Sequence, residues 1–216
     1  ELTEKVRKTM RPLNPDSVIT SEGVGECWLD LLDLDLAREV SDLSGHVGSE
    51  QSLPIPMFHS VYHDYHITYG TVSTFKPRRS GQAHFLEHFH YAEALTLVGG
   101  GQLMISGVFG GDEDKEKFRP FFEYMEKLTR ARKCARNHFN LGRWLPPPAV
   151  DCDRVDVKYS SSRPPKANIP AVLGGAFEYE SEVVVPLVNH TEQECAATVD
   201  LAPEHFGRTQ PWSKAT

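Results

Sequence analysis

The fold is decided by residues 17–30, which read SVITSEGVGECWLD. A short strand-like run opens this stretch over residues 17–21, and Glu22 ends it. Gly23 and Gly25 then allow the backbone to turn sharply into the next segment. Because the loops that follow parallel strands converge on one face of an α/β fold, we expect this polar loop to border a functional site.

The pattern up to about residue 142 alternates short strand-like runs with longer helix-like runs, which is the rhythm of parallel α/β units. The predicted strands cover residues 17–21, 55–61 and 103–106. Residues 83–97 form a mostly apolar segment that is helical or mixed, and the predicted helices cover residues 1–10, 28–40 and 115–137. The last of these helices is amphipathic, with phenylalanine, methionine and leucine side chains on one face.

The composition changes after this helix, where residues 142–150 read GRWLPPPAV. Three consecutive prolines exclude a helix and predict a stiff, extended connector. The strand-like runs beyond it are separated by turn residues and cover residues 154–159, 171–179, 182–188 and 196–201. We therefore expect an α/β domain over residues 1–145 and a small, all-β sandwich-like domain over residues 146–216 that packs on the first.

The charge balance argues against a nucleic acid or a membrane surface as the main partner. The 216-residue chain has a formal net charge of -7 and a pI near 5.8. Its one basic cluster fits the solvated end of a helix and consists of Arg130, Arg132, Lys133 and Arg136. No run approaches the roughly 20 apolar residues that a membrane span requires. The glycine runs at residues 99–101 and 110–111 lack the spacing of a dinucleotide or phosphate loop, so we expect no cofactor.

The cysteines and the start of the chain leave the cellular compartment open. The cysteines lie far apart without a C-x-x-C pair, so their disulfide state is undetermined; they are Cys27, Cys134, Cys152 and Cys195. The chain starts without methionine, shows no signal peptide, and begins with residues that read as the middle of a helix. We interpret the sequence as part of a longer or processed protein, whether extracellular, periplasmic or cytoplasmic.

Carboxylate and aromatic residues at the end of the first strand predict carbohydrate chemistry. Glu22 ends the strand, and Glu26 and Trp28 follow on the same loop. A carboxylic acid there would protonate a leaving oxygen while the indole ring stacks on a sugar face. The alternative is that Glu22 only caps the following helix, where a negative charge is favoured. We favour the catalytic interpretation.

A second polar cluster lies in residues 55–70, which read IPMFHSVYHDYHITYG. So many polar and aromatic side chains at the end of an apolar strand are costly to bury unless they face a wet cleft. We predict Asp64 as the second catalytic carboxylate. The residues predicted to contact the sugar here are His59, Tyr62 and His63. The alternative is a surface loop whose histidines have no special role.

Histidine pairs with helical spacing raise the alternative of a metal site. His59 and His63 are four residues apart. His84 and His88 have the same spacing, which places two imidazoles on one face of a helix. Neither pair has the H-E-x-x-H order of a zinc hydrolase, and the first pair starts in a predicted strand. We therefore expect no metal, and a metal-dependent hydrolase that uses His84, His88 and His90 is the weakest alternative.

Five segments in a fixed order carry a resemblance to a known family. They are SEG followed by GECWLD, IPMFHSVYHDY, EALTLVGGGQLMISG, FEYMEKLTRARKCARNHFNLGRWLPPP and EVVVPLVNHTEQECAATVDL. In this order they resemble the last units and the C-terminal β-domain of large (β/α)8-barrel glycoside hydrolases, most nearly a glycosidase-like group classed as a domain of unknown function. The resemblance spans nearly the whole chain. It implies a partial TIM barrel of three units, with the earlier units upstream.

The sequence as a whole predicts the C-terminal part of a glycoside hydrolase of carbohydrate metabolism, which cleaves glycosidic bonds with two carboxylates. The resemblance implies that one carboxylate of the pair can lie upstream, so that this part is inactive alone. The expected partners are a carbohydrate substrate and either the N-terminal half of the barrel or a second copy, since exposed strand edges need cover. The alternative from another class is a non-catalytic carbohydrate-binding or scaffold protein.

Overall fold

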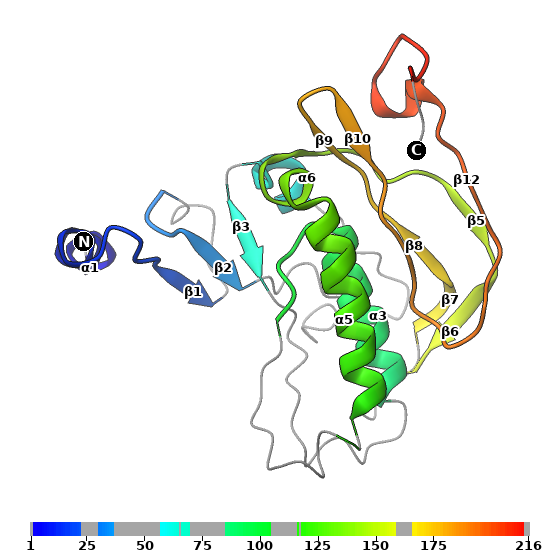
Figure 1. The fold of residues 1–216 in the computed structure, drawn as a ribbon, viewed down its shortest axis with the longest axis horizontal. Coiled ribbons are helices and arrows are strands. Elements are labelled where there is room, and N and C mark those ends of the chain that lie inside the picture. The colour runs from blue at the N-terminus through cyan, green and yellow to red at the C-terminus, as the bar shows by residue number, and fades with distance from the viewer. Residues whose placement is uncertain are drawn as a thin grey trace.

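The computed structural model describes residues 2–22, 30–36, 57–64, 66–69, 85–104, 116, 118–158 and 166–213. Up to residue 141 the elements are α1 Leu2–Leu13, β1 Thr20–Glu22, β2 Leu34–Leu36, α2 Met57–Tyr62, β3 Ile67–Tyr69, α3 Phe85–Val98, α5 Arg119–Cys134 and α6 Arg136–Leu141. The later elements are β4 Arg143–Trp144, β5 Val150–Cys152, β6 Arg154–Val157, β7 Lys166–Pro170, β8 Val172–Gly174, β9 Phe177–Tyr179, β10 Glu182–Val184, β11 Leu187–Asn189, β12 Ala197–Val199 and the 3-10 helix η2 Pro203–Phe206. Figure 1 shows how the chain runs from α1 through a small sheet and a pair of helices to the β-rich part.

A parallel sheet joins the first three strands in the order β1-β2-β3. Thr20 pairs with Leu34, and Leu34 pairs with Ile67, so the three strands start side by side. Tyr69 forms a further parallel bridge with Gln102, which adds a fourth segment next to β3. Parallel pairing agrees with the predicted α/β units, and the complete barrel stays a prediction.

The helix predicted over residues 28–40 is wrong for residues 34–36, which form β2. Residues 31–36 read LLDLDL, and their alternation of leucine and aspartate has the period of two that strands show. The Asp33 carboxylate also accepts a hydrogen bond from the Ile19 backbone nitrogen at 2.8 Å. This contact holds the start of β2 beside the segment that enters β1. Residues 34–36 therefore pair as a strand, although the spacing of the leucines also fits a helix.

The strand predicted over residues 55–61 is also wrong, because α2 occupies residues 57–62. Pro54 and Pro56 stand just before this helix in the sequence, where the fixed φ of proline suits a helix start. The strand comes later as β3, whose isoleucine, threonine and tyrosine have high strand propensity. Asp64 therefore precedes a strand instead of following one.

Helices α3 and α5 pack against each other through aromatic side chains. The helix over residues 119–134 is confirmed as predicted, and the segment predicted as helical or mixed is a helix over residues 85–98. On α5, Phe121, Met125 and Leu128 are buried at the spacing of one helix face. Phe121 packs on Phe89 of α3 with ring centroids 4.0 Å apart. No helix of the described residues has both the length and the apolar composition to cross a membrane.

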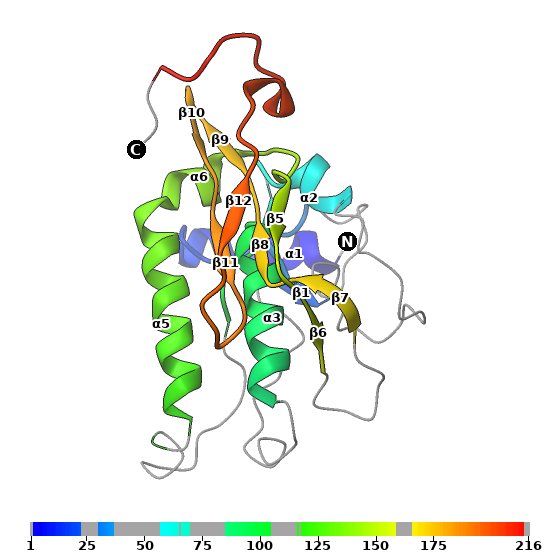
Figure 2. The ribbon, with the colours of Figure 1, turned by 90° about the vertical axis from the view of Figure 1, so that its right-hand side faces the viewer.

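The β-rich part pairs its strands antiparallel and packs on α3. Its pairs are β9 with β4 and β10, β8 with β11, β5 with β12, and β6 with β7. Phe177 and Val188 of this part are buried in one cluster with Leu97 of α3 and Phe139 of α6. Figure 2 shows the strands alongside α3. The strands and the helices therefore share one apolar core. Within the described residues the free thiols are Cys134, Cys152 and Cys195.

Candidate functional site

The carboxyl ends of the parallel strands form one edge of the sheet. Glu22 pairs with Leu36, and Leu36 pairs with Tyr69, so these residues form a row across β1, β2 and β3. Gln102 extends the row beyond Tyr69. Glu22 thus ends a parallel strand, as predicted, at the edge where α/β folds place their ligands.

Two hydroxyl groups lie close to this edge and were missed by the sequence analysis. The Tyr69 hydroxyl is 3.0 Å from Oγ1 of Thr20, which stands two residues before Glu22. Ile67 lies on the same face of β3 as Tyr69, since side chains alternate along a strand, and it is 38% exposed. This face of the sheet is therefore accessible from solvent. A tyrosine that ends a strand-forming run just before Gly70 was the available sequence signal.

Asp64 lies at the opposite end of the sheet. It is exposed in the turn between α2 and β3, so it comes before β3. From Ile67 to Tyr69 β3 advances about 7 Å, and two strand spacings separate β1 from β3 by about 10 Å. The start of β3, three residues after Asp64, is therefore roughly 12 Å from the backbone of Glu22. The expectation that Asp64 ends a strand is wrong, because β3 begins after it, and its pairing with Glu22 stays a prediction.

His63 is buried in the core and does not face a cleft. Its Nδ1 donates a hydrogen bond to the Gly142 carbonyl oxygen at 2.9 Å, and its ring lies 5.1 Å from that of Phe177. Burial lowers the pKa of His63, because the charged form loses its hydration, so the imidazole is neutral at pH 7. A Cβ placed on Gly100 would come within 2.1 Å of its Nε2. His63 joins the turn before β3 to α6 and β9, away from the edge that Glu22 occupies.

Of the other predicted sugar contacts, the structure describes only the two on α2. His59 and Tyr62 belong to α2, on the same side of the sheet as Asp64, and Tyr62 is half-buried. The side chains of Glu22 and His59 are outside the described part. Glu26 and Trp28 also lie outside the described residues.

A buried arginine ties the fourth segment of the sheet to the helices. Arg132 donates to the side-chain oxygens of Gln102 at 3.2 Å and Asn140 at 2.8 Å, and to the Gly100 carbonyl oxygen at 3.2 Å. Its guanidinium lies 5.0 Å from the centre of the Phe139 ring. Burial lowers the pKa of Arg132 to about 10, so it remains charged at pH 7. The expectation of a solvated basic cluster is wrong at this residue, whose role is to position neutral backbone and amide groups.

Helix α3 carries two of the three histidines of the metal-site alternative. His88 is half-buried, whereas His90 is buried, with its ring 4.1 Å from that of Tyr124. Burial, with a smaller effect of His190, lowers the pKa of His90 to about 4. Among the residues that the structure describes, no group of three histidine, cysteine, aspartate or glutamate side chains can hold a metal. His84 lies outside them.

A groove of about 550 Å³ runs along α5 and reaches Leu103, the residue after Gln102. Its lining consists of Leu103, Phe122, Met125, Glu126, Thr129, Arg130 and Lys133. The Glu126 carboxylate in it pairs with Arg130 at 2.6 Å. The groove therefore offers no acid pair for hydrolysis.

Comparison with known proteins relates the first third of the chain to a family. Residues 1–73 of the 216 match the model described as Domain of unknown function (DUF6259). This match contains the whole β1-β2-β3 sheet with Glu22 and Asp64. No curated protein and no solved structure matches the chain. The resemblance to a domain of unknown function is supported over these residues, and the relation to glycoside hydrolases stays a prediction.

Proposed function

We propose that the chain is the C-terminal part of a carbohydrate-active hydrolase in which Glu22 is the general acid/base. The observation that carries the proposal is the position of Glu22 at the carboxyl end of a parallel strand, in one row with Leu36 and Tyr69. A glutamic acid at such an edge donates a proton to the glycosidic oxygen as the bond to the leaving group breaks. Its carboxylate can then take a proton from the attacking water.

The hydroxyl pair of Thr20 and Tyr69 supports the same site. The two oxygens lie 3.0 Å apart on a solvent-accessible face of the sheet, two residues before Glu22 on β1. Hydroxyl groups exchange hydrogen bonds readily with those of a sugar, and the tyrosine ring offers apolar surface to a pyranose. We assign these side chains to substrate contact.

The proposal excludes Asp64 from the catalytic pair. Hydrolysis needs a second carboxyl group within roughly 5 to 10 Å of the first, and Asp64 is at the other end of the sheet. The second acid in this proposal reaches the row of Glu22 from another segment at the same edge.

The test compares two isosteric substitutions in the complete protein. Glu22→Gln removes the transferable proton and should lower turnover of aryl glycosides by about 10² to 10⁴-fold. Asp64→Asn is the matched control and should leave turnover within about twofold. Unaltered turnover in Glu22→Gln refutes the proposal, and an equal loss in Asp64→Asn refutes the assignment of the acid.

The separation of Glu22 from Asp64 also favours a second candidate, a non-catalytic carbohydrate-binding protein that has no acid pair. Titration calorimetry of the complete protein with oligosaccharides distinguishes the two. Sugar binding without turnover of any aryl glycoside supports this candidate over the hydrolase.

A further inference from the structure

Two buried histidines lie at the junction between the α/β part, residues up to 141, and the β-rich part, residues 143–213. His63, in the turn before β3, is 7% exposed and donates to the Gly142 carbonyl oxygen. His190, which directly follows β11, is 2% exposed, and its Nε2 donates to the Pro170 carbonyl oxygen at 2.9 Å. Each side of the junction therefore contributes one buried imidazole.

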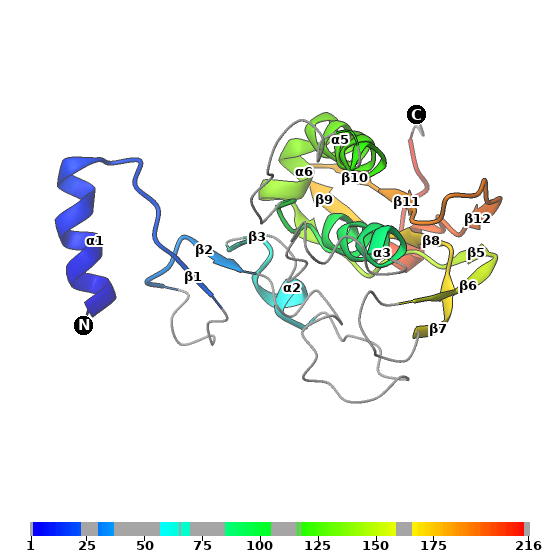
Figure 3. The same ribbon diagram turned by 90° about the horizontal axis from the view of Figure 1, so that it is seen from below.

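Each of these two rings packs on an aromatic side chain from the other side of the junction. The ring of His63 lies 5.1 Å from that of Phe177 on β9, and the ring of His190 lies 5.3 Å from that of Tyr91 on α3. Phe177 is fully buried and belongs to the same apolar cluster as Leu97 of α3. Figure 3 shows the strands of the β-rich part beside α3. The packing of the β-rich part on α3 therefore surrounds both imidazoles.

The surroundings of His63 disfavour its protonated form. Burial lowers the pKa of His63, because the charged imidazole loses its hydration. The Gly142 carbonyl oxygen opposes this effect, whereas the guanidinium of Arg132 on α5 lowers the pKa of His63 further. Asp64 and the backbone of Phe139 oppose the lowering by smaller amounts. A proton on His63 would therefore add a cation beside Arg132 in the buried junction.

The surroundings of His190 act in the same direction. Burial lowers its pKa, and the Pro170 carbonyl oxygen and the more weakly coupled carboxylate of Glu87 on α3 oppose this effect. His90 is a like-charged neighbour when both rings are protonated, because His190 contributes to lowering the pKa of His90. Protonation of His190 is therefore costly as long as the β-rich part stays packed on α3.

A third buried histidine at the junction has a carboxylate within reach. The ring of His138 on α6 lies 5.8 Å from that of Tyr179 on β9, and its Nε2 lies 3.9 Å from Oε2 of Glu182 on β10. This carboxylate offsets a proton on His138. Acid therefore charges the junction without such compensation at His63 and His190.

We propose that His63 and His190 form an acid switch, in which protonation of both imidazoles loosens the packing of the β-rich part on the helices. In the closed junction both rings resist protonation, whereas in an opened junction they take up protons near their ordinary pKa of about 6.5. The state that binds more protons gains population as the pH falls, so opening is favoured below about pH 6.5. The switch is independent of the proposed function, because it involves neither Glu22 nor a sugar.

Two buried alanines on different faces of α3 can report whether the junction opens. Ala94 and Ala92 are both fully buried. Ala94 belongs to the apolar cluster that contains Phe177 of the β-rich part. Ala92 lies one turn before Thr96, whose Cγ2 would lie 3.0 Å from a Cβ on Gly101, next to the fourth segment of the parallel sheet. A cysteine at position 94 therefore monitors the junction, and a cysteine at position 92 monitors the opposite side of α3.

The test measures how fast a maleimide labels Ala94→Cys and Ala92→Cys in the full chain, with peptide mass spectrometry to separate these sites from the native cysteines. Each rate is divided by the rate of the urea-unfolded chain at the same pH. From pH 6.5 to pH 5 the normalised rate at position 94 should rise by about 10 to 10²-fold, because each of the two histidines can contribute about tenfold. The rate at position 92 should stay within about twofold, because that side of α3 remains packed.

Glutamine substitutions show which histidines supply the protons. Glutamine keeps an N–H donor for the carbonyl oxygen and cannot be protonated in this pH range. In the Ala94→Cys chain, His63→Gln or His190→Gln alone should reduce the acid acceleration to about its square root, and the double variant should leave less than about twofold. The matched control is His205→Gln, since His205 also donates to a carbonyl oxygen, that of Pro147 at 2.8 Å, but is exposed. This control should keep the full acceleration.

Three outcomes overturn the proposal. The first is a labelling rate at position 94 that does not rise between pH 6.5 and pH 5. The second is an equal rise at positions 94 and 92, since the whole chain would then unfold in acid. Neither of these measurements uses a histidine variant, so they decide the matter even if the glutamine variants do not fold. The third is full acceleration in the double glutamine variant, because other groups would then supply the protons.

Discussion

Replacing Gly100 by alanine tests directly whether His63 is packed in the core. A Cβ at this position would lie 2.1 Å from His63 Nε2 and 2.9 Å from Phe177 Cε1. The imidazole cannot move aside at low cost, because its Nδ1 is held by the Gly142 carbonyl oxygen and its ring packs on Phe177. The added methyl group therefore has to displace buried side chains.

Gly207 provides a matched control with the same local turn. Gly100 has φ +84 and follows α3, and Gly207 has φ +70 and follows η2. In both turns the glycine nitrogen donates three residues back and the next nitrogen donates five residues back, which is the Schellman pattern. Apart from its two chain neighbours, the described residues place no atom within 4 Å of a Cβ on Gly207. The two substitutions thus share backbone strain and differ in the clash.

The expected losses follow from these two contributions. The left-handed conformation costs alanine about 1 to 2 kcal/mol of unfolding free energy at either position. Overpacking against His63 and Phe177 adds about 1 to 3 kcal/mol at Gly100 alone. We therefore expect Gly100→Ala to lose about 2 to 5 kcal/mol and Gly207→Ala about 1 to 2 kcal/mol.

Urea unfolding of the full chain, followed by tryptophan fluorescence, measures both losses. Adding His63→Ala to Gly100→Ala should give a total loss smaller than the sum of the single losses, since the clash disappears. Equal losses for the two glycine variants, or strict additivity of the double variant, would refute the packing of His63 against Gly100.

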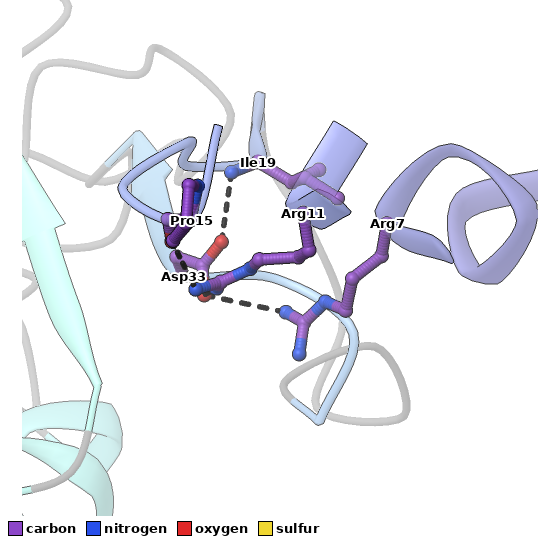
Figure 4. A network of polar contacts seen from close by, with 5 residues as sticks. All are labelled: Arg7, Arg11, Pro15, Ile19 and Asp33. Carbon is purple, nitrogen blue, oxygen red and sulfur yellow. Dashed lines mark hydrogen bonds and ion pairs between the residues drawn. The ribbon is translucent and has the colours of Figure 1, made fainter. Parts of the chain in front are cut away.

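The remaining predictions concern buried charges and the anchoring of α1. Arg132→Met removes the donor to the buried Gly100 carbonyl oxygen and to the half-buried side-chain oxygens of Gln102 and Asn140, so it should lower the unfolding free energy by about 2 to 4 kcal/mol. Arg130→Met, at an exposed ion pair, should cost under about 1 kcal/mol, and similar losses of the two variants in urea titrations would contradict this prediction. Stability should fall by about 3 kcal/mol between about pH 6.5 and pH 4, because burial lowers the pKa of His90 to about 4 while the unfolded chain takes up a proton near pH 6.5. His90→Phe should remove the loss of stability that His90 causes. If the variant keeps the pH dependence of the wild type, the assignment of this loss to His90 is wrong. Asp33→Ala removes the carboxylate on which Arg7 and Arg11 converge (Figure 4), so it should release α1 and speed tryptic cleavage within this helix. The control Glu4→Ala, at an exposed ion pair, should leave the cleavage rate unchanged. Equal cleavage rates of wild type and Asp33→Ala would show that Asp33 does not hold α1 in place.

The sequence by itself determined the features that depend on neighbouring residues. The period of apolar residues placed the helix α5, and the prolines after residue 145 marked the change to a β-rich part. The end of β1 at Glu22 was predicted for the same reason, since an apolar run stops there at a carboxylate and two glycines. Periodicity, propensity and turn chemistry act within one element, so one sequence displays them fully.

The tertiary structure decided which residues meet at one place. The segment LLDLDL fits a helix or a strand, and β2 forms because β1 and β3 pair with it on both sides. The locations of Asp64 and His63 depend on the same pairing, because both residues directly precede β3 and the position of β3 sets the end of the sheet at which they lie. Strand register and core packing join residues that are distant in the sequence, and such contacts leave no local pattern. For this reason Glu22 could be placed at a strand end from the sequence, whereas the separation of Asp64 and the burial of His63 could not.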